Sequence, residues 1–109
     1  MVETLAVGGG EPVEVIRVSA LADLPHGFLG RRGGVSRGLV AGLNVGLGAE
    51  DEPEAVAENR RRAVEAVSPG AELVTVYQVH SPDVVAVRSA WADAERPRAD
   101  AMVTDRPGL

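Results

Sequence analysis

The sequence predicts a mixed α/β domain, in which one helix stands among several short strands. The first observation is the run 73–79, LVTVYQV, which is rich in the residue types that suit a pleated, half-buried surface and which ends at His80. The second is a helical pattern from Asp51 to residue 67. The third is that the other apolar runs are short. At 109 residues, the chain is long enough for one modest domain.

The N-terminal third contains one predicted strand and one glycine-rich loop. Glycines at 8–10 predict a flexible N-terminus over residues 1–10, followed by a single domain over 11–109. Alternating apolar residues predict a strand over 13–18. Residues 26–38, HGFLGRRGGVSRG, hold five glycines in thirteen positions, which excludes a helix or a regular strand interior. Such glycines permit positive φ and a close approach of the backbone to another group.

A helix is predicted from Asp51, which we expect to be its N-cap, with Pro53 in the first turn. Glu58 and Arg62 stand four residues apart and predict an ion pair. The residues at 68–70, Ser-Pro-Gly, should end the helix. The apolar residues that fall on one helical face are Val56, Ala63, Val64 and Val67.

The last third reads as strands joined by turns. Runs at 73–79 and 84–88, separated by Ser-Pro-Asp, predict a hairpin with His80 at its tip. Residues 89–98 predict a loop, and residues 99–104 predict a third strand. The turn signal at 105–108 suggests a chain that stops just before its next strand.

Composition excludes several classes of function. The net charge of −5, with 16 acidic and 11 basic residues, argues against a nucleic-acid-binding protein. There is no secretory signal pattern and no apolar run long enough to span a membrane, so we expect a cytoplasmic protein that needs no membrane. The absence of cysteine excludes a cysteine-based metal cluster within this sequence.

Three groups of residues could carry chemistry. Arg31 and Arg32 in the glycine-rich loop could form an anion site with backbone N–H groups, or could simply be solvated surface arginines. His80 could be a metal ligand or a general base, or only a hydrogen-bonded hairpin residue. Asn44 and Gln78 carry amides inside apolar runs and could either pin the core or contact a ligand. The other possible metal ligands are His26, Asp83, Asp100 and Asp105.

Four blocks occur together in order: HGFLGRRGGVSRG, LNVGLGAEDEPEAVAENRRR, VYQVHSPDVVAV and ADAMVTDRPGL. Over about residues 20–109 they closely resemble the N-terminal part of the YfiH-type family, whose members are also described as laccase-domain proteins, multicopper polyphenol oxidases or purine nucleoside phosphorylases. The resemblance implies a compact mixed α/β fold of layered sheets with flanking helices, of which this chain would be an incomplete N-terminal part. It also implies phosphorolysis of adenosine, inosine, guanosine and methylthioadenosine, and deamination of adenosine.

The resemblance further implies a zinc site, with copper as the alternative. His80 matches one family ligand and would be both metal ligand and catalytic residue, whereas the other two, a cysteine and a histidine further along in the family, are not in this sequence. Purine nucleoside and phosphate would contact Arg31, Gly33, Gly34, Asn44 and Gln78. We therefore expect the chain alone to be inactive and to self-associate through an exposed sheet edge. The alternatives are a non-catalytic α/β module that binds an anion or nucleotide, and a copper-dependent polyphenol oxidase.

Overall fold

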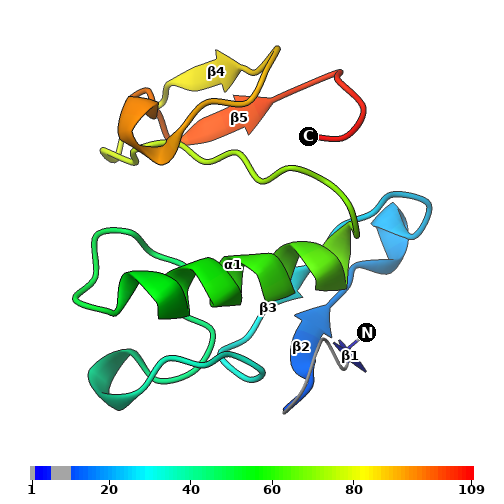
Figure 1. The fold of residues 1–109 in the computed structure, drawn as a ribbon. Coiled ribbons are helices and arrows are strands. Elements are labelled where there is room, and N and C mark those ends of the chain that lie inside the picture. Colours follow the sequence, from blue (N-terminus) through cyan, green and yellow to red (C-terminus); the bar gives the residue numbers. More distant parts are fainter. Residues whose placement is uncertain (1, 6–10) are drawn as a thin grey trace. The chain divides into compact units, whose positions relative to one another are not determined.

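The computed structural model describes residues 2–5 and 11–109. The chain forms two compact units, Met1–Gly70 and Ala71–Leu109, which contain one helix and two small sheets in the described residues (Figure 1). This confirms the mixed α/β class. The same described residues also form three short 3-10 turns, at Ser19–Leu21, Gly38–Val40 and Asp93–Glu95.

The first unit contains an antiparallel sheet in the order β1 (Val2–Leu5), β2 (Val13–Ile16) and β3 (Phe28–Leu29). Strand β2 confirms the strand predicted at 13–18. Strand β1 falls within the predicted flexible N-terminus, whose other residues, 1 and 6–10, lie outside the described residues. Strand β3 corrects the reading of the glycine-rich loop, because two of its residues pair with β2.

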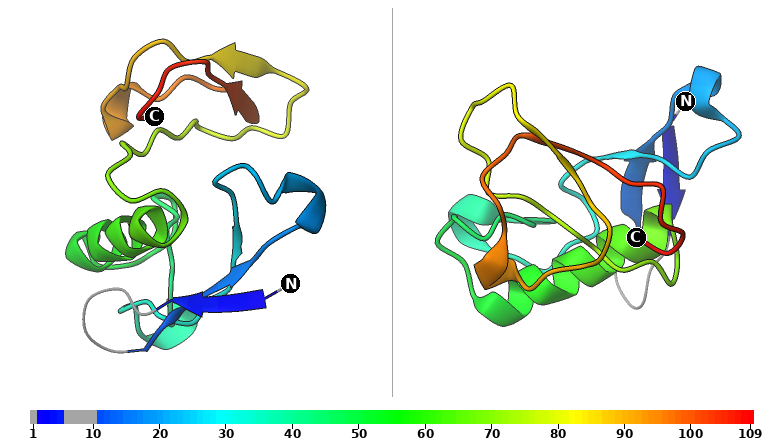
Figure 2. Two further views of the ribbon diagram at one scale, coloured as in Figure 1. Left: turned by 90° about the vertical axis from the view of Figure 1, so that its right-hand side faces the viewer. Right: turned by 90° about the horizontal axis from the view of Figure 1, so that it is seen from above.

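Helix α1 (Pro53–Val67) packs against this sheet, as the two views in Figure 2 show. Successive side chains of a strand point to opposite faces, so Val13 and Val15 lie on the same face of β2, where both are fully buried. Burying such a side chain contributes about 1.5–3 kcal/mol. The core of this unit consists of Val13, Val15, Leu43 and Ala66, with Leu29 packed against it.

The helix boundaries agree with the prediction at one end and differ at the other. Pro53 is the first helical residue, and the helix ends at Val67, before the predicted Ser-Pro-Gly stop. The N-cap is Glu52 rather than Asp51. The prediction of Asp51 was wrong because one oxygen of its carboxylate binds Ser36 and Asn44 of a distant loop, while the other accepts only the N–H of the next residue.

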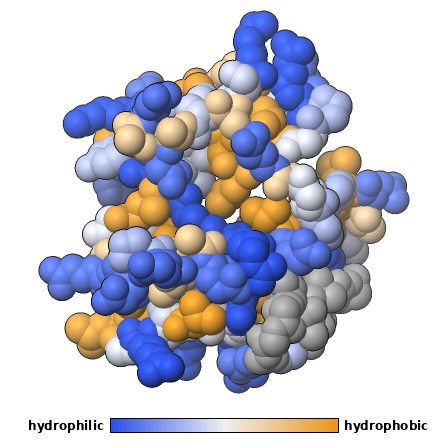
Figure 3. Space-filling view, in the orientation of Figure 1, coloured by the Kyte–Doolittle hydropathy of each residue, from blue (hydrophilic) through white to orange (hydrophobic). Residues whose placement is uncertain are grey.

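The second unit contains two parallel strands, β4 (Val84–Ala86) and β5 (Ala101–Val103). Strand β5 confirms the strand predicted at 99–104. The buried residues of this unit are Val76, Val87 and Ala99. In Figure 3, apolar side chains also reach the surface in the part that holds β4 and β5. On these two strands, the exposed large apolar residues are Val84, Met102 and Val103.

The predicted hairpin of 73–79 with 84–88 is wrong. The first segment is not a strand, and its one ladder contact is an isolated parallel bridge between Tyr77 and Arg98. A hairpin ladder would need the backbone N–H groups that end this segment, but those of Val79, His80 and Ser81 donate to a side chain instead. Helix α1 is the longest helix described, and no helix in the described ranges is long and apolar enough to cross a bilayer.

Candidate functional site

The turn at His80 is closed around the carboxylate of Asp100. One carboxylate oxygen accepts the backbone N–H groups of Val79 (3.1 Å) and Ser81 (2.7 Å) and the hydroxyl of Ser81 (2.8 Å). The other oxygen accepts the backbone N–H of His80 at 3.0 Å. Four donors from three consecutive residues therefore converge on one side chain that lies about twenty residues further along the chain.

His80 has an unusual backbone and an exposed ring. Its φ of 61° lies in the left-handed region, and no other non-glycine residue in the described ranges has a positive φ. That conformation costs an L-residue about 1 kcal/mol or more. The residue is exposed, and its ring nitrogens make no hydrogen bond to a described residue. The turn thus presents an imidazole to solvent from a backbone that is held in place.

The charge of Asp100 fits this arrangement. Hydrogen bonds from the backbone N–H and the hydroxyl of Ser81, with further bonds from the N–H groups of Val79 and His80, lower the pKa of Asp100 to about 2. Hydrogen bonds donated to the charged form of a carboxylate favour that form. The carboxylate is therefore ionised at neutral pH.

His26, the other histidine, is occupied on both sides of its ring. Its Nε2 accepts the backbone N–H of Val18 at 2.9 Å, and its Nδ1 lies 2.9 Å from the carbonyl oxygen of Leu24. Because both nitrogens bind nearby backbone, His26 has a structural part in the loop between β2 and β3. This difference between the two histidines was not predictable from the sequence, because it depends on which backbone groups the fold brings to each ring.

The glycine-rich loop packs closely against other backbone segments of the first unit. Gly33 is buried with φ 93°, and a Cβ there would lie 2.6 Å from the backbone of Val13. A Cβ on Gly34 would overlap the backbone of Gly42, so no other residue fits. The close approach that these glycines permit is therefore to other backbone segments of this unit. Arg31 binds Leu43 through its carbonyl oxygen (2.7 Å), and its side chain is exposed.

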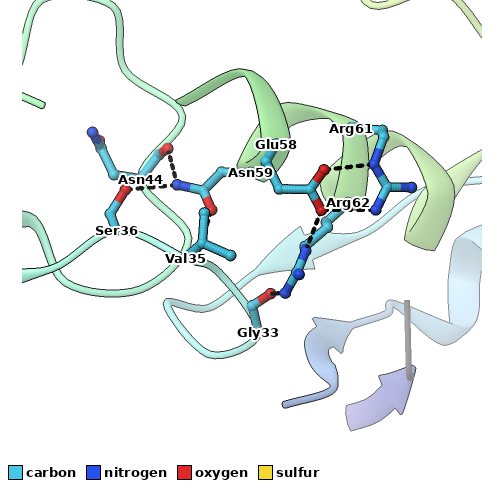
Figure 4. Close-up of polar contacts among 8 residues, drawn as sticks. All are labelled: Gly33, Val35, Ser36, Asn44, Glu58, Asn59, Arg61 and Arg62. Carbon is cyan, nitrogen blue, oxygen red and sulfur yellow. Dashed lines mark hydrogen bonds and ion pairs between the residues drawn. The ribbon is translucent and has the colours of Figure 1, made fainter. Parts of the chain in front are cut away.

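A buried amide organises the same loop, as Figure 4 shows. Asn59 of α1 is fully buried; its Oδ1 accepts the backbone N–H of Val35, and its Nδ2 donates to Ser36 Oγ and to the carbonyl oxygen of Asn44, each at 2.8 Å. Sequence reasoning missed Asn59. The available signal was its spacing, because Asn59 follows the buried Val56 by three residues and so falls on the apolar face of the helix.

Asn44 is half-buried, and its own amide is engaged too. Its Nδ2 donates to Asp51 (3.0 Å) and its Oδ1 accepts the backbone N–H of Gly46 (3.3 Å). Gln78 differs, since it is exposed. The structure therefore gives Asn44 a structural part and leaves the amide of Gln78 at the surface.

A second link joins the helix to the glycine-rich loop. Arg62 Nε contacts Glu58 at 2.7 Å, which confirms the predicted ion pair, and Arg62 NH1 donates to the carbonyl oxygen of Gly33 at 2.9 Å (Figure 4). Arg61 also binds Glu58 through two hydrogen bonds of 2.8 Å. Hydrogen bonds from Arg61 and then Arg62 lower the pKa of Glu58 to about 2.

The first unit has an open cleft of about 650 Å³ beside the N-terminus of α1. Three carboxyl residues and one arginine line it, so its charge does not suit a phosphate dianion. Its lining residues are Val35, Ser36, Arg37, Val40, Glu50, Asp51, Glu52 and Ala55.

The residues that could bind a metal do not gather into a full site. A catalytic zinc takes about three protein ligands. No three His, Cys, Asp or Glu side chains in the described ranges lie close enough to hold a metal ion. His80 presents one exposed imidazole, which is a group that can bind a metal. The described residues do not form a zinc or copper site by themselves.

Comparison with known proteins identifies the family. Residues 25–109 match the family described as multi-copper polyphenol oxidoreductase laccase. The chain belongs to this laccase-domain family. The match covers the glycine-rich loop, helix α1 and the whole second unit, so both candidate regions lie within the family domain.

Several curated relatives are named as purine nucleoside phosphorylases. One from Streptomyces griseus is 45% identical over 84 residues, which are 75% of this chain and 34% of the relative. One from Streptomyces coelicolor is 44% identical over 85 residues, 76% of this chain and 35% of the relative. One from Deinococcus radiodurans is 39% identical over 98 residues, 87% of this chain and 36% of the relative. The chain thus spans about a third of the length of these relatives.

Proposed function

We propose that this chain forms part of a purine nucleoside phosphorylase and supplies one metal ligand, His80. The family match and the names of the relatives support the enzyme class. The observation that carries the proposal is the exposed imidazole of His80, held on a left-handed backbone by Asp100. Strained residues persist where the surroundings fix them, and they are enriched at functional sites.

The proposed substrates are a purine nucleoside and phosphate, with adenosine, inosine, guanosine and methylthioadenosine as candidates and adenosine deamination as a second activity. Phosphorolysis brings a phosphate dianion to a ribose carbon as its bond to the base breaks. The exposed guanidinium of Arg31 is the proposed phosphate contact. Gly33 and Gly34 would set the conformation of the loop that carries Arg31, and Asn44 would stabilise that loop through its hydrogen bonds. Gln78 would offer an exposed amide beside the turn at His80.

Zinc is the proposed cofactor, with copper as the alternative. When bound, either metal would act as a Lewis acid at the reacting group. The remaining ligands are proposed to come from outside the described residues, because no three His, Cys, Asp or Glu side chains among these lie close enough together to hold a metal ion. A cytoplasmic location is proposed with this function.

Phosphate-dependent release of base from adenosine or inosine tests the proposal, with the protein purified at its natural length. We expect turnover that is lost in His80→Ala and kept in Glu95→Gln, since Glu95 is an exposed carboxyl residue of the same unit. No turnover in the unmodified protein would refute the proposal. Phosphate binding without turnover would instead support an anion-binding module.

A further inference from the structure

We propose that Asp100 is the positioning residue of His80: its carboxylate holds the turn that aims the imidazole. The inference rests on the proposed function to the extent that His80 is the functional group. Asp100 would act through the backbone of His80, since its contact is with the N–H of that residue and not with the ring.

The contacts of the carboxylate explain how a strained turn persists. His80 adopts a φ of 61°, where glycine or asparagine is the usual residue. Three successive N–H groups, those of Val79, His80 and Ser81, point to one carboxylate, which requires the backbone to leave the extended conformation, because successive residues of an extended strand point to opposite sides. Hydrogen bonds to a charged group are stronger than those between neutral groups, and the four that converge on this carboxylate offset the cost of the left-handed backbone.

The carboxylate is itself anchored on the far side of the turn. The backbone N–H groups of Asp100 and Ala101 both donate to the carbonyl oxygen of Asp83, at 3.1 and 3.2 Å. On the near side, Tyr77 donates its N–H to Pro97 (2.9 Å) and accepts from Ala99 (3.1 Å). The segment 97–101 therefore binds the chain before and after His80, and Asp100 closes the turn between them.

The direction of the imidazole depends on this closure. The orientation of the Cα–Cβ bond follows from φ, so a turn that relaxed to negative φ would point the ring elsewhere. A residue at position 100 whose side chain cannot accept these hydrogen bonds would leave the three backbone N–H groups without their acceptor. The turn would then favour the common extended conformation.

The test compares three variants of the chain by NMR and amide hydrogen exchange. Asp100→Asn keeps the shape of the side chain but replaces one acceptor oxygen by an NH₂ group, which faces backbone N–H groups. Ser81→Ala removes one of four donors. Asp105→Asn is the matched control, because it changes the same charge at an exposed position of the same unit.

We expect Asp100→Asn to raise the exchange rates of amides 79–81 by about tenfold or more. The Cα and Cβ shifts of His80 should leave their left-handed values while the ring signals of His26 stay unchanged. Ser81→Ala should have a smaller effect, and Asp105→Asn none. Unchanged amide exchange and unchanged His80 shifts in Asp100→Asn would overturn the proposal.

If Asp100→Asn does not fold, the double variant Asp100→Asn with His80→Gly provides the second measurement. Glycine takes positive φ without the steric cost, so this variant should regain its fold while exchange at 79–81 stays fast. A double variant as unstable as Asp100→Asn alone would count against a role of Asp100 at this backbone.

Nucleoside turnover at natural length separates this proposal from the proposed function. Loss of turnover in His80→Ala together with full turnover in Asp100→Asn would overturn the positioning role and leave the function intact. Full turnover in His80→Ala would overturn the function, whereas the exchange data would still decide whether Asp100 holds the turn.

Discussion

The two histidines of the chain differ in what their ring nitrogens contact. Both nitrogens of His26 bind backbone groups of its own loop, whereas the ring of His80 has no such partner in the described ranges. A ring whose nitrogens are both engaged cannot bind a metal without breaking these bonds. At the residue scale, His80 is therefore the histidine that is available for chemistry.

Replacing His80 tests whether its backbone is strained. His80→Gly and His80→Ala both remove the imidazole, but only glycine adopts a φ of 61° without cost. We expect His80→Gly to be more stable than His80→Ala by about 1 kcal/mol in urea unfolding. Equal stabilities, or a more stable alanine variant, would show that this position does not require a left-handed backbone.

Asn59→Ala should be strongly destabilising. It removes a fully buried amide and leaves the N–H of Val35 and the carbonyl oxygen of Asn44 without this partner, and a partner lost at a buried site costs about 1–3 kcal/mol. Thermal unfolding measures the effect. The matched control is Gln78→Ala, which removes the same type of amide from an exposed position and should change stability by less than about 0.5 kcal/mol. Similar losses in both variants would contradict this account.

Residue roles were predictable only where they depend on local pattern. His80 stands out because it follows a run of strand-type residues and lies in a recognisable block. Its partner Asp100 does not, because the two are brought together by pairing between segments twenty residues apart. Similarly, Asn44 was visible as an amide in an apolar run, but its partner Asn59 lies on a charge-rich helix whose buried face is set by tertiary packing.

At the scale of elements, α1 was predictable and the hairpin was not. Helix boundaries follow from neighbours along the chain, such as Pro53 at the start and the Ser-Pro-Gly stop at the end. Strand pairing depends on segments elsewhere: β4 pairs in parallel with β5, which lies beyond an intervening loop. The residue types at 73–79 suit a strand, but the backbone N–H of Val79 donates to the Asp100 side chain and the backbone of Tyr77 pairs with Pro97 and Ala99.

Helix α1 should lose stability in acid through Glu58. Its folded pKa is lowered from 4.5 to about 2, so the stabilisation is fully present above pH 4.5 and is lost as pH falls toward 2. Glu58→Gln should be less stable than wild type at pH 7, and the difference should shrink across this window. Circular dichroism follows the helix signal, with Glu72→Gln, in the second unit, as control. A difference that does not change with pH would contradict the assignment.

At the scale of the whole molecule, the β4–β5 sheet is unusual. Parallel sheets are normally covered on both faces, yet all three residues of β5 are exposed. Exposed strand edges recruit other chains. The expected self-association stays a prediction, and this sheet is the surface that we propose for it.

Val103→Lys tests that surface. Val103 is 59% exposed on β5, and a lysine on an edge strand discourages pairing with another chain. We expect wild type to show a concentration-dependent mass in light scattering, and Val103→Lys to reduce it. Leu39→Lys, which adds the same charge at an exposed apolar residue of the first unit, should leave association unchanged. A monomeric wild type would remove the basis for this expectation.

The central claim is that the turn at His80 exposes its imidazole to a ligand. A zinc titration followed by NMR tests this claim most directly. The chain has two histidines, so each ring can be followed separately. Because the nitrogens of His26 are engaged and those of His80 are not, Zn²⁺ should shift or broaden the ring signals of His80 first, with weak binding that a chelator reverses. A response at His26 first, or no response at His80, would contradict the claim.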